Sequence, residues 1–193
     1  MILSEKQKAI IEASGKLLMR KGILGLTTKN LAQEMNFSES ALYRHFKNKD
    51  HIVLLLIQFL SNNISERFEV ILNSNTNPEE KFTQIFGSQF EFFNKNPHFI
   101  VIILSDGLMD NSPEIKNEIL QLIQTNAASF KNVIVQGQNE QLFNQEIEAD
   151  SLVHFAMGTF RLQMLQWKLS NFSFDIEEQG MKTMKKLLIL LKK

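Results

Sequence analysis

Residues 28–46, TKNLAQEMNFSESALYRHF, contain two short helical patterns that are separated by a break. The first pattern places Leu31 and Ala32 on one face, and the second begins at Ser38, a residue type that caps helix N-termini. Asn36 stands in the break and tolerates a left-handed backbone better than most residues with a side chain. Two short helices joined by a tight turn predict a helix-turn-helix, although a helical hairpin inside a bundle has the same pattern.

The composition favours a helical protein with a substantial core. The chain has 193 residues, 44% of them hydrophobic, and contains only 3 Pro and 8 Gly. These values, together with the helical patterns along the chain, predict an all-α fold. There is no Cys, which excludes disulfides and thiolate metal sites and favours a cytoplasmic location. The longest apolar run, residues 52–57, is too short to span a membrane.

Charge is distributed unevenly along the chain, although the net charge is zero. Residues 1–51 contain nine Lys and Arg against five Asp and Glu, a net charge of +4, so the remainder carries −4. A basic N-terminal segment joined to an acidic body is typical of a small polyanion-binding domain attached to a regulatory domain. We therefore expect a DNA-binding domain at residues 1–48 and a second helical domain at residues 49–193.

Apolar residues recur at helical spacing through most of the chain. The first helix is expected to end at Gly22, after Arg20 and Lys21, because glycine and cations are common at helix C-termini. Thr27 or Thr28 can cap the second helix. After the helix-turn-helix, the patterns predict longer helices at about residues 49–73, 78–94, 113–136, 146–170 and 175–191.

Residues 10–57, IIEASGKLLMRKGILGLTTKNLAQEMNFSESALYRHFKNKDHIVLLLI, resemble the TetR family of bacterial repressors. The resemblance rests on the helix that ends in Lys21-Gly22, on the TT…LA start of the second helix, and on ALYRHFKNKD with the helix after it. It covers the three helices of the family's DNA-binding domain and the start of the fourth, with Asn36 where the family usually has Gly. It implies a homodimeric, ligand-responsive repressor that binds a palindromic operator in double-stranded DNA and a small hydrophobic effector.

The resemblance assigns contacts with the DNA backbone to four residues. Thr28 matches the residue that hydrogen-bonds phosphate at the start of the second helix, and Lys49 matches the phosphate contact at the start of the fourth. Tyr43 and His45 match residues that grip the backbone. The residues themselves leave alternatives open, since the Tyr43 ring can pack between helices, His45 falls at an inward position, and Lys49 can cap a helix or pair with Asp50.

Base contacts are implied for Lys29, Glu39 and Ser40, whose positions face base edges in the family. Ala41 matches a position that touches a thymine methyl group or approaches a phosphate closely. As an acid in the first helical turn, Glu39 stabilises the helix dipole, and its carboxylate can also accept from a cytosine amino group. Arg44 is a further candidate for DNA contact, with simple solvation as the alternative.

Phenylalanine is abundant, with 16 residues in the whole chain. Aromatic and Met side chains suit the lining of an apolar effector cavity, while a filled Phe-rich core is an equally simple interpretation. The candidates for a cavity lining are Phe90, Phe93, Phe99, Ile103, Met109, Phe130, His154 and Phe155.

The last two expected helices are candidates for a dimer interface. Ala156 and Gly158 permit close helix approach, and large apolar residues recur at helical spacing through both segments. Part of these residues must also serve the core of the chain itself. The interface candidates are Phe160, Met164, Trp167, Met181, Met184 and Leu188.

Motifs of enzymes are absent from the sequence. It contains no nucleophile elbow, P-loop, dinucleotide-binding or zinc-protease motif, and no Cys. Asp150 and His154 are spaced to share one face of a helix, but no third ligand is evident, so no metal is expected. We therefore expect no enzymatic activity and no cofactor. The remaining alternative is a DNA-binding protein controlled by a protein partner, with a filled core instead of a small-molecule pocket.

Overall fold

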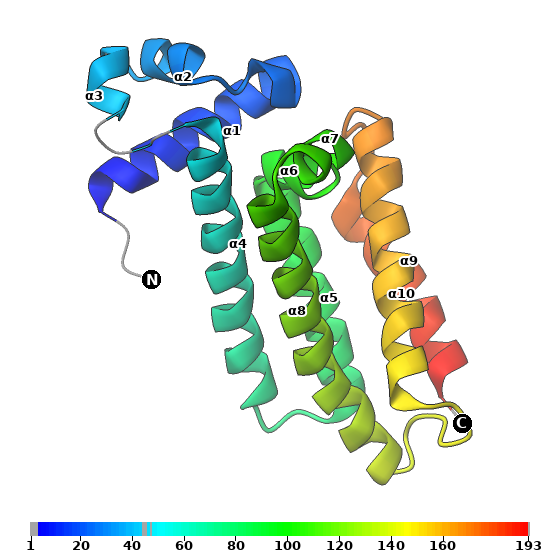
Figure 1. Cartoon of the computed structure of the whole chain (residues 1–193). Coiled ribbons are helices and arrows are strands. Elements are labelled where there is room, and N and C mark those ends of the chain that lie inside the picture. Colours follow the sequence, from blue (N-terminus) through cyan, green and yellow to red (C-terminus); the bar gives the residue numbers. More distant parts are fainter. Residues whose placement is uncertain (1–3, 44–45, 47, 193) are drawn as a thin grey trace. The chain divides into compact units, whose positions relative to one another are not determined.

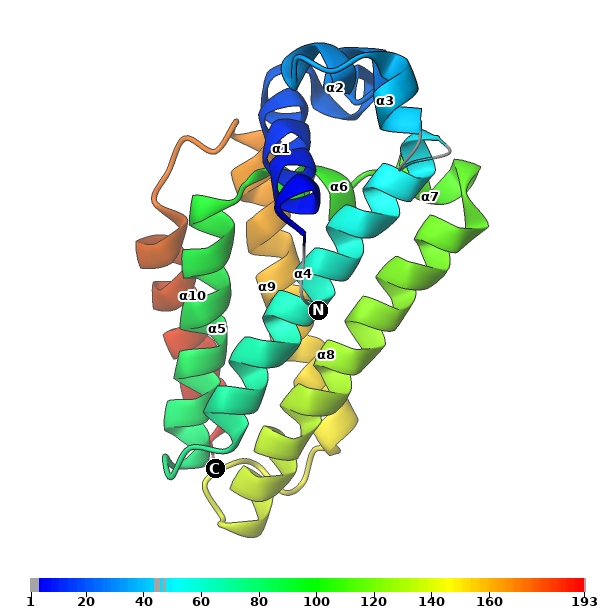
Figure 2. The same ribbon diagram turned by 90° about the vertical axis from the view of Figure 1, so that its left-hand side faces the viewer.

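The structure, a computed structural model, describes residues 4–43, 46 and 48–192. Within these residues it consists of α-helices without a named β-strand, which confirms the expected all-α fold (Figures 1 and 2). The helices are α1 (Glu5–Gly25), α2 (Thr28–Glu34), α3 (Glu39–Tyr43), α4 (Lys49–Leu72), α5 (Pro78–Lys95), α6 (His98–Ile103), α7 (Asp106–Asn111), α8 (Pro113–Asn139), α9 (Ala149–Leu169) and α10 (Ile176–Leu191). None of the helices in the described part of the chain is long and apolar enough to cross a membrane.

The first helix is broken where the sequence predicts its end. Ser4 caps α1 by accepting a hydrogen bond from the backbone N–H of Gln7 at 3.2 Å, and the Gln7 side chain accepts from the backbone N–H of Ser4. Gly22 has φ 62° and ψ −168°, a conformation that residues with a side chain rarely adopt. The regular helical path therefore ends at Gly22, although a further helical segment follows as far as Gly25.

The chain divides into two compact units. Unit 1 comprises Met1–Asn62 and Asn96–Gln121, and unit 2 comprises Asn63–Lys95 and Leu122–Lys193. α4 and α8 each contribute their N-terminal part to unit 1 and their C-terminal part to unit 2. The three N-terminal helices thus share unit 1 with α6 and α7, and the domain boundary between residues 48 and 49 stays a prediction.

Buried leucines hold the N-terminal helices of unit 1 together. Leu17 of α1 is 1% exposed, and Leu31 of α2 and Leu42 of α3 are 0% exposed. Burial of a leucine side chain contributes about 1.5–3 kcal/mol to stability. Arg20 and Glu34 form an ion pair between α1 and α2, but an exposed pair of this kind contributes less. The apolar contacts are therefore the main interactions that hold α2 and α3 on α1.

Aromatic side chains from α5, α8 and α9 form the core of unit 2. The ring centroid of Phe86 lies 5.2 Å from that of Phe130 and 5.7 Å from that of Phe160. α10 approaches this core closely at Gly180, where an added Cβ atom would lie only 2.5 Å from Cε1 of Phe90. These rings, with Phe82 and Phe93, are called the Phe cluster below. Glycine at position 180 is what allows α10 to pack against it.

One side chain holds the polar connector before α9. Nε2 of Gln138 donates to the carbonyl oxygens of Asn144 at 2.7 Å and Ile147 at 2.8 Å. Because these carbonyls are bonded to α8, the connector does not form a helical turn, and α9 begins at Ala149 instead of near residue 146.

Candidate functional site

The turn between α2 and α3 is shaped by caps and by one left-handed residue. Thr27 caps α2 by accepting from the backbone N–H of Asn30 at 3.1 Å. Ser38 accepts from the backbone N–H of Ala41 at 3.2 Å and so caps α3. Asn36, between the two helices, has φ 54°. The caps and the left-handed turn residue that the sequence predicts are therefore confirmed.

The residues expected to face base edges lie on the surface of α2 and α3. Lys29, Glu39 and Ser40 are exposed, and Ala41 is half-buried. Leu42, which is 0% exposed, fixes α3 to the core of unit 1. The polar side chains are thus free to meet a partner while their helix is anchored, as a recognition helix requires. Their contacts with DNA stay a prediction.

Two residues expected to contact phosphate are joined by a hydrogen bond. The hydroxyl oxygens of Thr28 on α2 and Tyr43 on α3 lie 3.0 Å apart. The Tyr43 side chain is 51% exposed, so its ring is not part of the core, which was the alternative interpretation. One of the two hydroxyl groups donates its hydrogen in this bond, so the pair keeps one O–H donor for a phosphate group. Arg44 and His45, the next two candidates, lie outside the described residues.

Lys49 forms a hydrogen bond within its own chain. Its Nζ donates to the backbone carbonyl of Ile23, at the end of α1, at 2.8 Å. Burial lowers the pKa of Lys49, and the charge of Asp50 opposes this effect. An ammonium group has three N–H donors, so the bond to Ile23 leaves two for a phosphate. Helix capping, one of the alternatives for Lys49, is therefore compatible with phosphate contact.

Part of the expected cavity lining lies in the Phe cluster of unit 2. Phe90, Phe93 and Phe130 are at most 2% exposed. Phe90 and Phe93 have ring centroids 5.1 and 6.2 Å from that of Phe160, and Phe130 lies against Phe86. These rings therefore contact other rings of the same cluster.

The remaining lining candidates lie elsewhere. Phe99, Ile103 and Met109 belong to unit 1, where Phe99 is buried and the other two are half-buried. His154 and Phe155 are exposed on α9, and Phe155 is 49% exposed. The prediction that His154 and Phe155 line a cavity within a single chain is therefore wrong. The physical reason is that α9 turns this face away from the Phe cluster that its other face covers.

A cation without an acidic partner lies between α4 and α5, and the sequence analysis missed it. Nε of Arg67 donates to Oδ1 of Asn63 at 2.9 Å, and Nη1 donates to the carbonyl and hydroxyl oxygens of Ser88 at 2.6 and 3.0 Å. Nη2 donates to Oε1 of Gln89 at 2.8 Å, and Gln89 is only 6% exposed. Burial lowers the pKa of Arg67 to about 10, against the attraction of Glu91.

No ion pair among the described residues includes Arg67, because Glu91 accepts from Lys95 at 2.6 Å instead. The guanidinium also lies over the ring of Phe92, 4.9 Å from its centroid. Burying a cation costs free energy that neutral acceptors offset only in part. Its acceptors on α5 lie 21 and 22 residues away in the chain, so no local sequence signal pointed to this cluster.

Comparison with known families covers both the helix-turn-helix and the body. Residues 10–56 match the family described as bacterial regulatory proteins, tetR family, and residues 58–190 match the YsiA-like protein, C-terminal region. The second match alone covers more than half of the chain. The chain belongs to the TetR family of transcriptional regulators. It is therefore a DNA-binding transcriptional regulator with a family helix-turn-helix, and members of this family are regulators, not enzymes.

Individual relatives of this TetR-family chain are distant. The uncharacterized HTH-type transcriptional regulator YerO of Bacillus subtilis is 27% identical over 163 residues, which cover 81% of this chain and 56% of YerO. The chain thus spans little more than half the length of that relative. The nucleoid occlusion factor SlmA of Colwellia psychrerythraea is 27% identical over 178 residues, which cover 90% of each chain.

Two solved structures show the same fold. The fatty acid degradation regulator FadR of Bacillus halodurans has a TM-score of 0.85 at 16% identity, covering 97% of this chain and 96% of that one. FadR of Bacillus subtilis, solved in complex with stearoyl-CoA, has a TM-score of 0.80 at 15% identity, covering 95% and 96%. At these identities the likeness shows the fold alone.

The structure of this TetR-family chain places most of the expected dimer residues in its own core. Met164, Trp167, Met184 and Leu188 are between 0 and 9% exposed, and Phe160 belongs to the Phe cluster. Buried side chains cannot reach a second copy, so the prediction that Met164, Trp167, Met184 and Leu188 form the interface is wrong. Phe160 and Met181 are half-buried, and their place in an interface stays a prediction. The exposed apolar residues of the two helices are different ones, namely Phe155, Leu162, Leu165, Leu169, Ile189 and Leu190.

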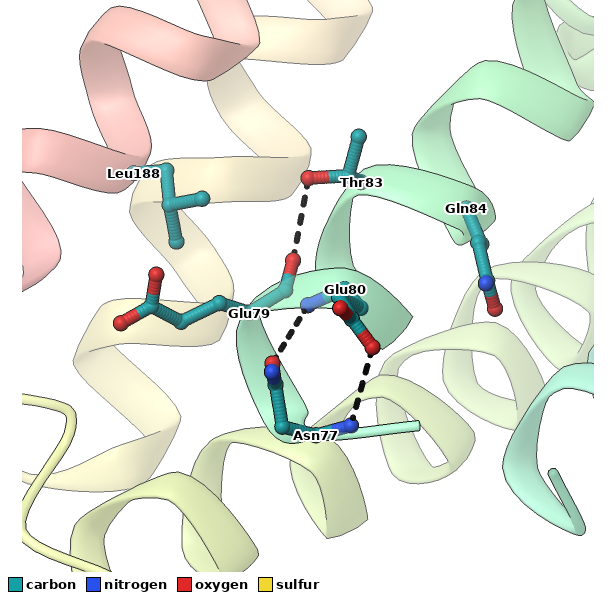
Figure 3. Close-up of a pocket in the computed structure, with 6 residues that line it drawn as sticks. All are labelled: Asn77, Glu79, Glu80, Thr83, Gln84 and Leu188. Atoms are coloured by element: carbon teal, nitrogen blue, oxygen red, sulfur yellow. Dashed lines mark hydrogen bonds between the residues drawn. The ribbon is translucent and has the colours of Figure 1, made fainter. Parts of the chain in front are cut away.

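A shallow polar groove of about 510 Å³ lies beside the start of α5 (Figure 3). Its polar groups mostly serve the helix itself. Oδ1 of Asn77 accepts from the backbone N–H of Glu80 at 2.9 Å, and Oγ1 of Thr83 donates to the carbonyl of Glu79 at 3.0 Å. The lining is completed by Gln84 and by Leu188 of α10. This groove contains none of the expected cavity residues, and we assign it no role.

The left-handed residue of the turn gives a test of the helix-turn-helix. We expect Asn36→Ala to lower the free energy of unfolding by about 1 kcal/mol, because alanine disfavours this conformation. Asn36→Gly should leave stability unchanged or raise it slightly, since glycine adopts positive φ without strain. Urea denaturation of both variants is the measurement, with Asn132→Ala on the exposed face of α8 as the control. Equal stability of the Ala and Gly variants would contradict this account of the turn.

Proposed function

We propose that this chain is a ligand-responsive repressor that binds a pseudo-palindromic operator as a homodimer. The observation that carries the proposal is the exposed surface of α2 and α3, on which Thr28 and Tyr43 share a hydrogen bond. Lys49 holds the end of α1 and keeps two donors available. In this proposal Thr28, Tyr43 and Lys49 contact phosphates and set the register, while Lys29, Glu39, Ser40 and Ala41 face base edges.

We propose a dimer because one DNA-binding domain of charge +4 binds DNA weakly. Two linked DNA-binding domains gain avidity and read a palindrome. The surface that supports a second copy is the exposed apolar stripe of α9, formed by Phe155, Gly158, Leu162, Leu165 and Leu169. These positions are three or four residues apart, so they share one face of the helix. Exposed apolar stripes of this kind mark protein interfaces.

We further propose that the effector is a hydrophobic molecule with an anionic group. The Phe cluster supports the hydrophobic part. Arg67, which among the described residues donates to neutral acceptors only, supports the anionic part. The B. subtilis FadR structure contains stearoyl-CoA, which combines both features. Effector binding would favour a conformation in which the spacing of the two DNA-binding domains no longer matches operator half-sites about 34–36 Å apart. The expected coupling is about 1–3 kcal/mol.

A second candidate is control by a protein partner. Two observations favour it: the rings of Phe90, Phe93 and Phe130 lie against other rings of the Phe cluster, and SlmA, the relative covered to 90%, is named a nucleoid occlusion factor. In this case the body would present a docking surface and would not open a cavity for a small molecule.

Selection of bound DNA from a random pool tests the DNA-binding proposal. We expect a palindromic consensus, because each copy of a dimer reads one half-site. Tyr43→Phe and Lys49→Ala should weaken binding to all sequences alike. Lys49→Ala should also reduce the slope of log K against log salt concentration by about 1. Glu39→Ala should relax base preference more than it lowers affinity. Glu69→Ala, an exposed acid of α4, is the control. A consensus without two-fold symmetry would contradict the dimeric model.

If Glu39→Ala lowers affinity without changing the consensus, the carboxylate has only its stabilising effect on the helix N-terminus.

The dimer face is tested by one charge on α9. Leu162 is 55% exposed, so Leu162→Glu should leave the fold intact but convert a dimer to a monomer in sedimentation velocity. Val70→Glu on α4 is the matched control, since Val70 is 73% exposed and lies outside the proposed interface. A wild-type monomer at micromolar concentration, or a dimeric Leu162→Glu variant, would rule out this face.

The effector proposal is tested with stearoyl-CoA, dodecanoate and the uncharged dodecanol as probes in calorimetric titration. We expect the two anions to bind more tightly than the alcohol. Arg67→Met should remove most of this preference and Arg67→Lys should retain part of it, because the charge is kept but the planar fork is lost. Lys116→Met on α8 serves as the control, and circular dichroism checks that each variant folds. Absence of binding by all three probes would favour control by a protein partner.

A further inference from the structure

The contact between α1 and α6 buries polar groups without pairing them. His98, the first residue of α6, lies directly on Gly15 of α1, where an added Cβ atom would be 3.0 Å from both Cε1 and Nδ1 of the imidazole. Ser14, the neighbour of Gly15, is 0% exposed. Within the part of the chain that the structure describes, neither Oγ of Ser14 nor Nε2 of His98 has a hydrogen-bond partner. Both groups lose hydration in the folded chain without gaining a bond among the described residues.

Among the described residues, no charged group compensates for the burial of the imidazole. α6 contains no second titratable residue, and α4 contains none between Ile52 and Asn62. On α1, Glu12 and Lys16 flank Gly15, but both are exposed and pair with each other at 2.9 Å. No acid or base of α7 or α8 contributes either, since burial alone lowers the pKa of His98 to about 4. The contact therefore accepts a neutral imidazole and has no counter-charge for an imidazolium.

We propose that the contact between His98 and Gly15 is a proton-sensitive latch, which holds α6 against α1 while the imidazole is neutral and releases it when the imidazole takes up a proton. Gly15 matters to this contact because a Cβ atom at that position would force the imidazole to shift by a few tenths of an ångström. The ring of Phe99, with its centroid 4.4 Å from that of His98, also packs against the imidazole.

The sign and size of the effect follow from linkage. When α1 and α6 separate, water reaches the imidazole, and its pKa returns toward the ordinary value of about 6.5. The separated form then binds the proton more tightly, so the contact is fully stable above this pH and weakens as the pH falls toward 4. Between pH 7.5 and 5.5 the ratio of separated to closed form should rise roughly tenfold.

A single thiol can report on the latch because the chain contains no cysteine. Ser14→Cys places the thiol at the buried position next to Gly15, and Lys16→Cys places one at the exposed position on the other side of Gly15 in the sequence. Both variants react with 4,4′-dithiodipyridine, and the protection ratio is the reaction rate of Lys16→Cys divided by that of Ser14→Cys. The pH dependence of the thiol chemistry cancels in this ratio. We expect this ratio to fall roughly tenfold from pH 7.5 to pH 5.5. Adding His98→Gln should reduce the change to less than twofold, whereas adding His154→Gln, an exposed histidine, should leave it tenfold.

NMR titration of the histidine rings gives a second measurement on the unmodified chain. The His98 ring should titrate below pH 5, and titration near pH 6.5 would overturn the proposal. Equal pH dependence of protection with and without His98→Gln would overturn it too. Any effect of the latch on operator affinity rests on the proposed function. Unchanged affinity together with pH-dependent protection would therefore support the latch and contradict its coupling to DNA.

Discussion

The hydrogen bond from Nζ of Lys49 to the carbonyl of Ile23 closes the chain segment that contains both helices of the candidate DNA-binding surface. The carbonyl of Ile23, just after the break at Gly22, accepts from the backbone N–H of Leu26 at 3.3 Å, and the first residue of α4 supplies a second donor. The cost is the burial of a charged amine, which is seen in its lowered pKa. A lysine that is already held in place loses less side-chain freedom when a phosphate arrives.

Local signals in the sequence were enough to predict the helix-turn-helix. Thr27, Asn36 and Ser38 act on backbone groups only a few residues away, so their residue types determine their roles. The buried and exposed faces of α9 could not be assigned in the same way, because this helix has apolar residues around its whole circumference. Whether Met164 or Leu165 is buried depends on where α10 and the Phe cluster lie, and sequence spacing does not contain that information.

Arg67 and His98 are half-buried basic side chains that show opposite solutions to one problem, the loss of hydration. Arg67 stays charged and donates to amide, hydroxyl and carbonyl oxygens, and none of the ion pairs among the described residues includes it. His98 stays neutral and unpaired at Nε2, so unit 1 contains a group that ionises more easily outside its contact than inside it. The first arrangement favours an anion and the second responds to a proton. Neither arrangement was predicted from the sequence, because both depend on which groups the neighbouring helix presents.

The leucines exposed along α9 have a consequence for how much of the protein is folded at a given expression level. Association that covers them stabilises the native chain by mass action, so the proposed dimer melts at a temperature that rises with its own concentration. At low abundance the separated chains expose an adhesive apolar surface and become better substrates for proteases and chaperones. The lowest concentration of folded regulator that a cell can maintain would then depend on the apolar side chains of one face of α9.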